Sequence, residues 1–127
     1  MSVTIHEKAH DPARELYEYE VLGPNNVVVG MAQLRLKASK GPDMPKGFES
    51  NIYYEIKPEH RGKNYATDTL RAVIKVAQER GTNQVVATVN KSNLASIRVI
   101  EKCGGKLAEE SVTTKGVSVL KYLITTN

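Results

Sequence analysis

Positions 56–67 of the chain read Ile56-Lys57-Pro58-Glu59-His60-Arg61-Gly62-Lys63-Asn64-Tyr65-Ala66-Thr67, and this stretch decides the fold. A β-type run from Asn51 to Ile56 leads into it, a turn and a short basic loop follow, and an amphipathic helix starts at Tyr65. Such a loop points backbone N–H groups and the positive end of a helix at one place, where Arg61 and Lys63 add charge. The stretch therefore predicts a phosphate-binding site.

A second motif, NKSNLASIRVIEKCG, follows at Asn90–Gly104. Together with the loop RGKNYA at Arg61–Ala66 it resembles the GNAT superfamily of acyl-CoA N-acyltransferases. The family's pyrophosphate loop reads Arg/Gln-x-x-Gly-x-Gly/Ala. The second motif is similar to Asn-x-x-Ser-x-x-Val-x-Glu-Lys-x-Gly, found in the branch of ribosomal-protein and small-molecule acetyltransferases. The resemblance covers roughly residues 15 to 125 and implies acetyl transfer from acetyl-CoA to an amine.

The periodicities predict one mixed α/β (α+β) domain over residues 1–127, with a mostly antiparallel sheet and two helices in the order β-β-β-α-β-α-β-β. A loop at Ser39–Ser50 either shapes a binding cleft or is a solvated connector. The strand at Gln84–Val89 is expected to be buried and central. The remaining predicted strands are Leu16–Leu22, Val27–Lys37, Asn51–Ile56, Lys106–Thr113 and Val117–Ile124, and the predicted helices run from Tyr65 to Arg80 and from Asn93 to Gly104.

The N-terminal region, residues 1–13, has no hydrophobic period and is predicted to be an extended or loosely ordered lead. Family members usually begin with one further strand and two helices, which commonly form a wall of the acceptor site. The resemblance thus implies a short form that lacks these elements. We expect the loss to leave apolar surface uncovered, and hence a homodimer in which a second copy or the lead covers it.

The composition argues against several other classes of protein. The chain has 127 residues, a net charge of +4 and one cysteine, Cys103, which cannot form an internal disulfide. No apolar run approaches the length of a membrane span, and the first residues lack a signal peptide, so a cytoplasmic location is expected. The lysines are scattered rather than clustered, so nucleic acid is not the expected main partner. His6 and His10 have no partner at metal-ligand spacing, and no metal is expected.

The resemblance implies that acetyl-CoA, the acyl donor, is held through backbone N–H groups of the loop. Asn64 stands where the family usually has glycine, and asparagine tolerates the left-handed backbone that this position requires. Asn90 and Asn93 either bond the pantetheine amides or the local backbone, and Asn93 alternatively serves only as a helix cap. The expected cofactor-binding residues are Ile56, Arg61, Gly62, Lys63, Asn64, Tyr65, Ala66, Thr67, Asn90 and Asn93.

Glu55 is the candidate general base. A neutral amine attacks the thioester in this family, so an ammonium acceptor must first lose a proton, often to a carboxylate on the strand before the loop. Tyr53 and Tyr54 flank Glu55, and a central strand would desolvate it. The alternative is a carboxylate paired with a neighbouring lysine or arginine.

The leaving thiolate often receives its proton from a tyrosine seven residues after the position matched by Asn93, but here that residue is Ile100. Ser96 matches the serine of the second motif and is a candidate donor to the thiol. Alternatively it is a small packing residue bonded to the preceding helical turn. His60 is expected to be a loop residue rather than a catalytic one.

Two other functions stay open. One is a non-catalytic acyl-CoA-binding module, which the missing N-terminal elements and the absent tyrosine favour. The other is a basic RNA- or ribosome-associated protein, which predicts binding that depends steeply on salt. The acceptor is also open among a polyamine, an aminoglycoside, an amino acid and a protein N-terminus.

Overall fold

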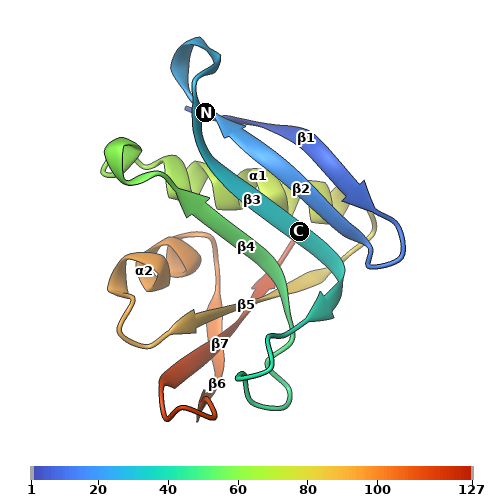
Figure 1. Cartoon of the computed structure of the whole chain (residues 1–127), viewed down its shortest axis with the longest axis vertical. Coiled ribbons are helices and arrows are strands. Elements are labelled where there is room, and N and C mark those ends of the chain that lie inside the picture. The colour runs from blue at the N-terminus through green and yellow to red at the C-terminus, as the bar shows by residue number, and fades with distance from the viewer. Residues whose placement is uncertain (1, 127) are drawn as a thin grey trace.

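The structure is a computed structural model that describes residues 2–126. It is a mixed α/β fold with antiparallel sheets and two α-helices, as predicted (Figure 1). The strands are β1 (Thr4–Asp11), β2 (Leu16–Leu22), β3 (Val28–Ser39), β4 (Ser50–Ile56), β5 (Gln84–Asn90), β6 (Lys106–Val112) and β7 (Ser118–Thr125). The α-helices are α1 (Tyr65–Glu79) and α2 (Leu94–Lys102), and short 3-10 turns lie at Pro24–Asn26 and Pro58–His60.

Strand β1 corrects the predicted order. The sequence predicts a loosely ordered lead at residues 1–13, whereas β1 pairs along β2 from Thr4 opposite Leu22 to Asp11 opposite Leu16. Most side chains of β1 are exposed on both faces, so the strand shows no hydrophobic alternation. Backbone pairing with β2 makes it a strand, and this leaves no trace in the pattern of side chains. The prediction that the first strand is missing is therefore wrong, and within residues 2–126 no α-helix precedes α1.

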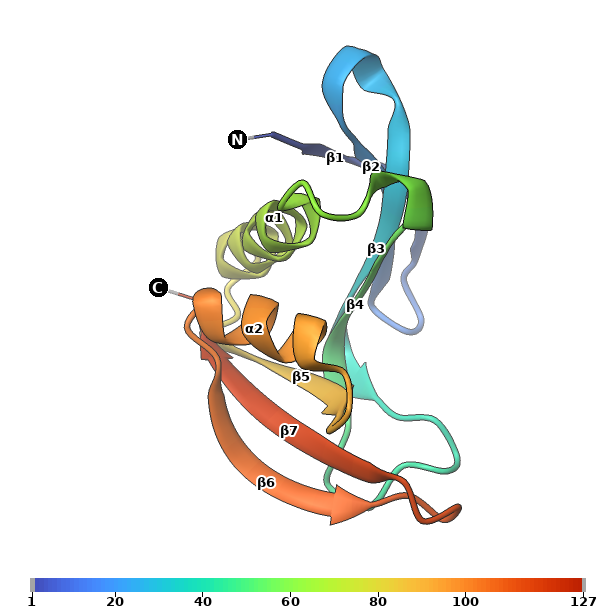
Figure 2. The same ribbon diagram turned by 90° about the vertical axis from the view of Figure 1, so that its left-hand side faces the viewer.

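The strands form two antiparallel sheets rather than one mixed sheet. The first has the order β1-β2-β3-β4 and the second the order β5-β7-β6. The predicted central place of β5 is wrong: among the described strands β5 is bonded only to β7, and its other edge faces β4 without a ladder. Figure 2 shows the second sheet curving away below α2. The two sheets therefore have room to diverge along the β4–β5 boundary.

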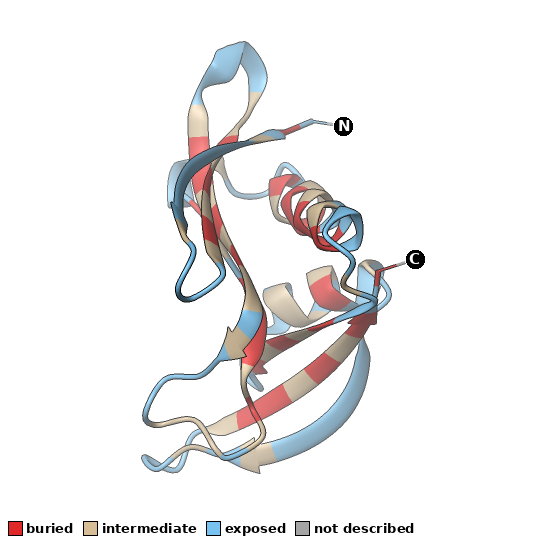
Figure 3. Ribbon diagram, turned by 90° about the vertical axis from the view of Figure 1, so that its right-hand side faces the viewer, coloured by how far each residue is buried: buried red, intermediate tan, exposed pale blue. Residues whose placement is uncertain are grey.

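The core lies between the first sheet and α1 and continues over β5 and β7. On the face of α1 that packs against the sheet, Leu70, Val73 and Ala77 are fully buried, while Ala66 is half-buried. In Figure 3 the buried residues of α1 and of the upright strands face each other. No helix within residues 2–126 has the length and apolar character needed to cross a membrane.

The Asn51 side chain joins the two sheets where no ladder does. Its amide nitrogen donates to the carbonyl oxygen of Arg35 on β3 at 2.8 Å, and its Oδ1 accepts from the backbone N–H of Val86 on β5 at 2.8 Å. The residue is only 7% exposed. This amide bonds one backbone group in each sheet. Both groups would otherwise be left unpaired where the two sheets separate.

Replacing Asn51 with alanine is therefore expected to lower the free energy of unfolding by about 3 kcal/mol, because two partly buried backbone groups lose their partners. Urea unfolding of the parent and the variant measures this. Asn83→Ala, at an exposed position, is the matched control and should change stability little. Equal stabilities of the two variants would contradict the bridging role.

The outer face of the first sheet, which points away from α1, is mostly polar, so the uncovered apolar surface that the sequence predicts is not found there. Tyr53 is its exposed aromatic residue, at 46% exposure. Exposed apolar side chains lie instead on β6, the outer strand of the second sheet, at Leu107 and Val112. The homodimer stays a prediction, and a monomer in sedimentation equilibrium at micromolar concentrations would count against it. The polar side chains of the outer face are Glu18, Glu20, Gln33, Arg35 and Glu55.

Candidate functional site

A cleft of about 770 Å³ opens where β4 and β5 diverge beyond the Asn51 bridge. One wall is β4 from Ile52 to Ile56, and the opposite wall is β5 from Ala87 to Asn90. The start of α1 and one side of α2 complete the lining. The cleft thus brings together the loop of the first motif and the helix of the second, which lie far apart in the sequence.

The loop before α1 turns twice through left-handed backbone, with φ of 80° at Gly62 and 64° at Asn64. The predicted tolerance of Asn64 for this conformation is confirmed. Asn64 precedes α1, and its side chain makes no capping hydrogen bond. The first N–H groups of a helix have no acceptor within the helix. Those of α1 therefore remain free to bind an anion at the mouth of the cleft.

Arg61 fixes the loop to the end of β4, because its Nε donates to the carbonyl oxygen of Ile56 at 3.0 Å. Arg61 lines the cleft, whereas Lys63 is exposed and lies outside the lining. The lining also includes Arg98 and Lys102, which are spaced four residues apart on α2. Sequence reasoning missed this pair, although residues four apart on a helix share one face. The basic side chains reinforce the positive end of α1 around the cleft.

All but one of the residues predicted to bind the cofactor or to take part in catalysis line the cleft, and the exception is Lys63. Ala66 presents a small, half-buried side chain at the start of α1, so a bulky ligand group meets little obstruction there. Of the predicted residues, those that line the cleft are Glu55, Ile56, Arg61, Gly62, Asn64, Tyr65, Ala66, Thr67, Asn90, Asn93 and Ser96.

The two asparagines between β5 and α2 both bond local groups. Asn93 Oδ1 accepts from the N–H of Ser96 at 3.2 Å, so Asn93 caps α2. Asn90 Oδ1 accepts from the N–H and the hydroxyl of Ser92, at 2.9 and 2.7 Å. Asn93 thus acts as the helix cap, as one of the two predicted alternatives has it. The Nδ2 group of each asparagine can still donate a hydrogen bond to a ligand in the cleft.

Glu55 lies at the edge of the cleft and is exposed, so its predicted desolvation is wrong. Alternation along β4 places Glu55 and Tyr53 on the outer face of the sheet, opposite the core. The Tyr53 hydroxyl donates a hydrogen bond to Glu55 Oε2 at 3.0 Å. That bond, more than burial, raises the pKa of Tyr53, because a neighbouring carboxylate favours the protonated phenol. The structure records no ion pair of Glu55 with a lysine or arginine among the described residues.

Tyr54 points the other way, to the inner face of the sheet, where it packs against the core beside the cleft. Its hydroxyl oxygen is buried and has no hydrogen-bond partner within residues 2–126. Burial raises the pKa of Tyr54, and the nearby Ser96 hydroxyl lowers it by less. Burial also raises the pKa of the Cys103 thiol, whose sulfur lies 3.8 Å from the Thr67 carbonyl oxygen. Cys103 therefore stays a neutral, half-buried residue.

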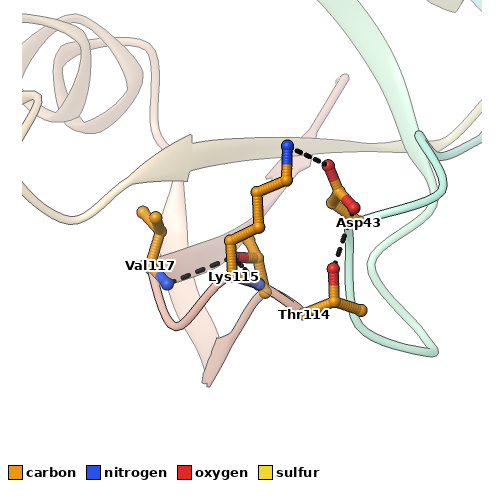
Figure 4. A network of polar contacts seen from close by, with 5 residues as sticks. Asp43, Thr114, Lys115 and Val117 are labelled. Carbon is orange, nitrogen blue, oxygen red and sulfur yellow. Dashed lines mark hydrogen bonds and ion pairs between the residues drawn. The ribbon is translucent and has the colours of Figure 1, made fainter.

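The loop between β3 and β4 is tied to the turn between β6 and β7 and is no free connector (Figure 4). Asp43 accepts from the Thr114 hydroxyl at 2.8 Å and pairs with the Lys115 Nζ at 3.4 Å. Phe48 anchors the loop in the core at 1% exposure. The loop borders a second hollow of about 370 Å³ beside Asn90, which lines both cavities. The loop borders this hollow but does not line the main cleft, so its predicted role in shaping a binding cleft stays a prediction.

Comparison with protein families finds that the acetyltransferase (GNAT) domain matches residues 3–106. A search of curated protein sequences finds no significant match. Solved structures with this fold include spermidine N-acetyltransferase from Vibrio cholerae in complex with CoA and spermine, which is 16% identical with a TM-score of 0.71 over 91% of this chain and 68% of that chain. A putative acetyltransferase from Salmonella typhimurium with acetyl-CoA is 21% identical, with a TM-score of 0.68 over 88% of this chain and 65% of that chain.

An aminoglycoside acetyltransferase in complex with coenzyme A is also similar, at 19% identity and a TM-score of 0.70 over 88% of this chain and 67% of that chain. The chain spans about two thirds of the length of these structures. At such identities the likeness shows a shared fold.

Proposed function

Because the chain belongs to the GNAT acetyltransferase family, we propose that it transfers the acetyl group of acetyl-CoA to an amine by direct attack of the amine nitrogen on the thioester carbon. The observation that carries the proposal is the uncapped start of α1, which meets a loop with two left-handed residues at the mouth of the cleft. This arrangement presents several N–H donors and the positive helix end to one anion. It suits the pyrophosphate of CoA.

In this proposal the rest of CoA runs into the cleft between β4 and β5. The amide nitrogens of Asn90 and Asn93 lie at the end of β5 and before α2, where they can bond the pantetheine amides. Arg98 and Lys102 add positive charge beside the same path. The apolar side chains of Ile52 and Val99, which also line the cleft, exclude water from the thioester.

The acceptor would approach from the outer face of the first sheet, where Glu55 takes the proton that the amine loses. Glu18 and Glu20 lie on that face two strands away. Glu20 pairs with the Nζ of Lys8 at 3.8 Å, so Glu18 and Glu55 are the carboxylates that favour a cationic amine. A structure with the same fold holds spermine. A polyamine is thus the first acceptor class to try, followed by aminoglycosides, amino acids and peptide N-termini.

A thioester-release assay with acetyl-CoA and a panel of these amines tests the proposal. We expect CoA release that depends on the amine and on its concentration. Binding of acetyl-CoA without release for any amine would favour a non-catalytic module instead. Binding to RNA with a steep salt dependence, and none to acetyl-CoA, would favour the nucleic-acid alternative.

A further inference from the structure

The second hollow, of about 370 Å³, lies on the face of the second sheet that points away from α2. Alternation along β7 places Leu120 and Tyr122 in the core, so Val119, which is only 4% exposed, lies on the opposite face. The loop between β3 and β4 lies over this face and lines the hollow. In Figure 2 both helices lie to the left of the first sheet, and this loop lies to its right. The hollow therefore opens on the same side of the molecule as Glu55.

The hollow adjoins the main cleft along the end of β5. Thr88, Val89 and Asn90 line both cavities, so a ligand can extend from one to the other past this strand. Asn51 and Val86 are bonded across the gap between β4 and β5, and Glu55 and Asn90 each lie four residues beyond that bond. An amine that is held at Glu55 thus has the rest of its atoms beside the hollow.

The lining of the hollow is mostly apolar and carries no net charge. Met44, Val117 and Val119 supply its apolar surface. Its two charged side chains, Asp43 and Lys115, pair with each other at 3.4 Å. An ammonium that entered the hollow would have to displace this lysine, whereas an apolar group loses no polar partner there. The lining therefore favours a neutral, apolar group.

Contacts across the rim form the hollow before any ligand enters. The Thr114 N–H donates to the Asp43 carbonyl oxygen at 3.0 Å, and the Thr114 hydroxyl donates to the Asp43 carboxylate at 2.8 Å (Figure 4). Phe48, at 1% exposure, anchors the same loop from below. A volume of about 370 Å³ lies in the range of small-molecule sites. Because the walls are already in place, a ligand that enters loses little free energy to ordering them.

We propose that this hollow binds the apolar part of the acceptor, an uncharged alkyl or side-chain group of a few carbon atoms, while the reacting nitrogen lies in the cleft beside Glu55. The inference rests on the proposed function and narrows its acceptor. Amines that carry an alkyl segment gain binding energy from the hollow. Aminoglycosides, which carry hydroxyl groups on most of their carbon atoms, gain none.

Primary amines from ethylamine to hexylamine test the proposal, because a longer chain adds apolar surface and hardly changes the basicity of the nitrogen. We expect kcat/KM to rise about fourfold for each methylene that enters the hollow, and to level off when the chain fills it. The amino alcohol in which a hydroxyl replaces the last methyl group of hexylamine should be a several times poorer substrate. Calorimetry with the amines and the CoA-bound protein should give the same order without turnover.

Val117→Trp fills the hollow from its rim, and Val27→Trp is the matched control. Val117 is 40% exposed, and its backbone groups, rather than its side chain, make its hydrogen bonds to Thr113, so a larger side chain is compatible with the fold. The ratio of kcat/KM for hexylamine to that for ethylamine should be about tenfold or more in the parent and close to one in Val117→Trp. Val27 is 47% exposed and lines neither cavity, so Val27→Trp should keep the parent ratio. Such a ratio does not depend on how much of each variant is folded.

The outcomes separate this inference from the proposed function. If the parent acetylates amines but shows no dependence on chain length, or if Val117→Trp keeps the parent ratio, the hollow does not bind the acceptor and acetyl transfer stands. If the parent releases CoA with none of the amines, the proposed function itself fails, and the role of the hollow fails with it.

Discussion

Replacing Ala66 with glutamate is expected to abolish the binding of acetyl-CoA and to leave the fold intact. Ala66 is half-buried in the first turn of α1 and lines the cleft. A carboxylate there repels the pyrophosphate and fills its place. The same carboxylate interacts favourably with the positive end of the helix, so the variant should fold. The expected loss of affinity is about a hundredfold or more.

Thermal unfolding with and without acetyl-CoA measures this effect by linkage. A ligand at about a hundred times its Kd adds about 2.7 kcal/mol to the stability of the parent, a shift of several degrees. The Ala66→Glu variant should show no shift. Gln78→Glu adds the same charge at an exposed site near the far end of α1 and should retain the shift of the parent.

A third variant separates the geometry of the loop from its charge. Lys63 is exposed and does not line the cleft, so Lys63→Ala should only weaken binding. If Ala66→Glu binds acetyl-CoA as well as the parent does, or if the parent shows no shift with millimolar acetyl-CoA, the loop does not hold the pyrophosphate.

Replacing Glu55 with glutamine is the second large change, and it should lower the maximal rate by roughly a hundredfold or more, the usual range for a positioned general base. Glutamine keeps the shape and still accepts a hydrogen bond from Tyr53, but it cannot take a proton. The affinity for acetyl-CoA should change little, because Glu55 lies on the outer face of the first sheet and outside the loop that is proposed to hold the cofactor. Steady-state kinetics with the best amine of the panel measures both quantities.

The pH dependence adds a further check on Glu55. An amine must be neutral to attack, so the rate of the variant should still rise with pH as the acceptor loses its proton. Glu59→Gln, at an exposed carboxylate outside the cleft lining, should behave as the parent does. An unchanged rate for Glu55→Gln at pH 7 would assign deprotonation to bulk water.

The core strands and the loop before α1 were predictable from sequence because their signals are local. Alternation in β2 and β3 and the apolar run of β5 each mark a strand, and the stripe through Leu70, Val73 and Ala77 marks α1. The left-handed turn at Asn64 follows from the residue itself. Such features depend on neighbours within a few positions, so the chain encodes them one segment at a time.

Features that depend on contacts between distant segments were decided by the tertiary structure alone. Strand β1 exists because β2 offers it an edge. The cleft opens where β4 and β5 share no ladder, beyond the single link from Asn51 to Val86, 35 residues away. Glu55 is exposed because nothing buries it on the outer face of the sheet. Tyr54 lies near Ser96 only because β4 and α2 line the same cleft. No periodicity records such partners, since each arises from the packing of elements that the chain places far apart.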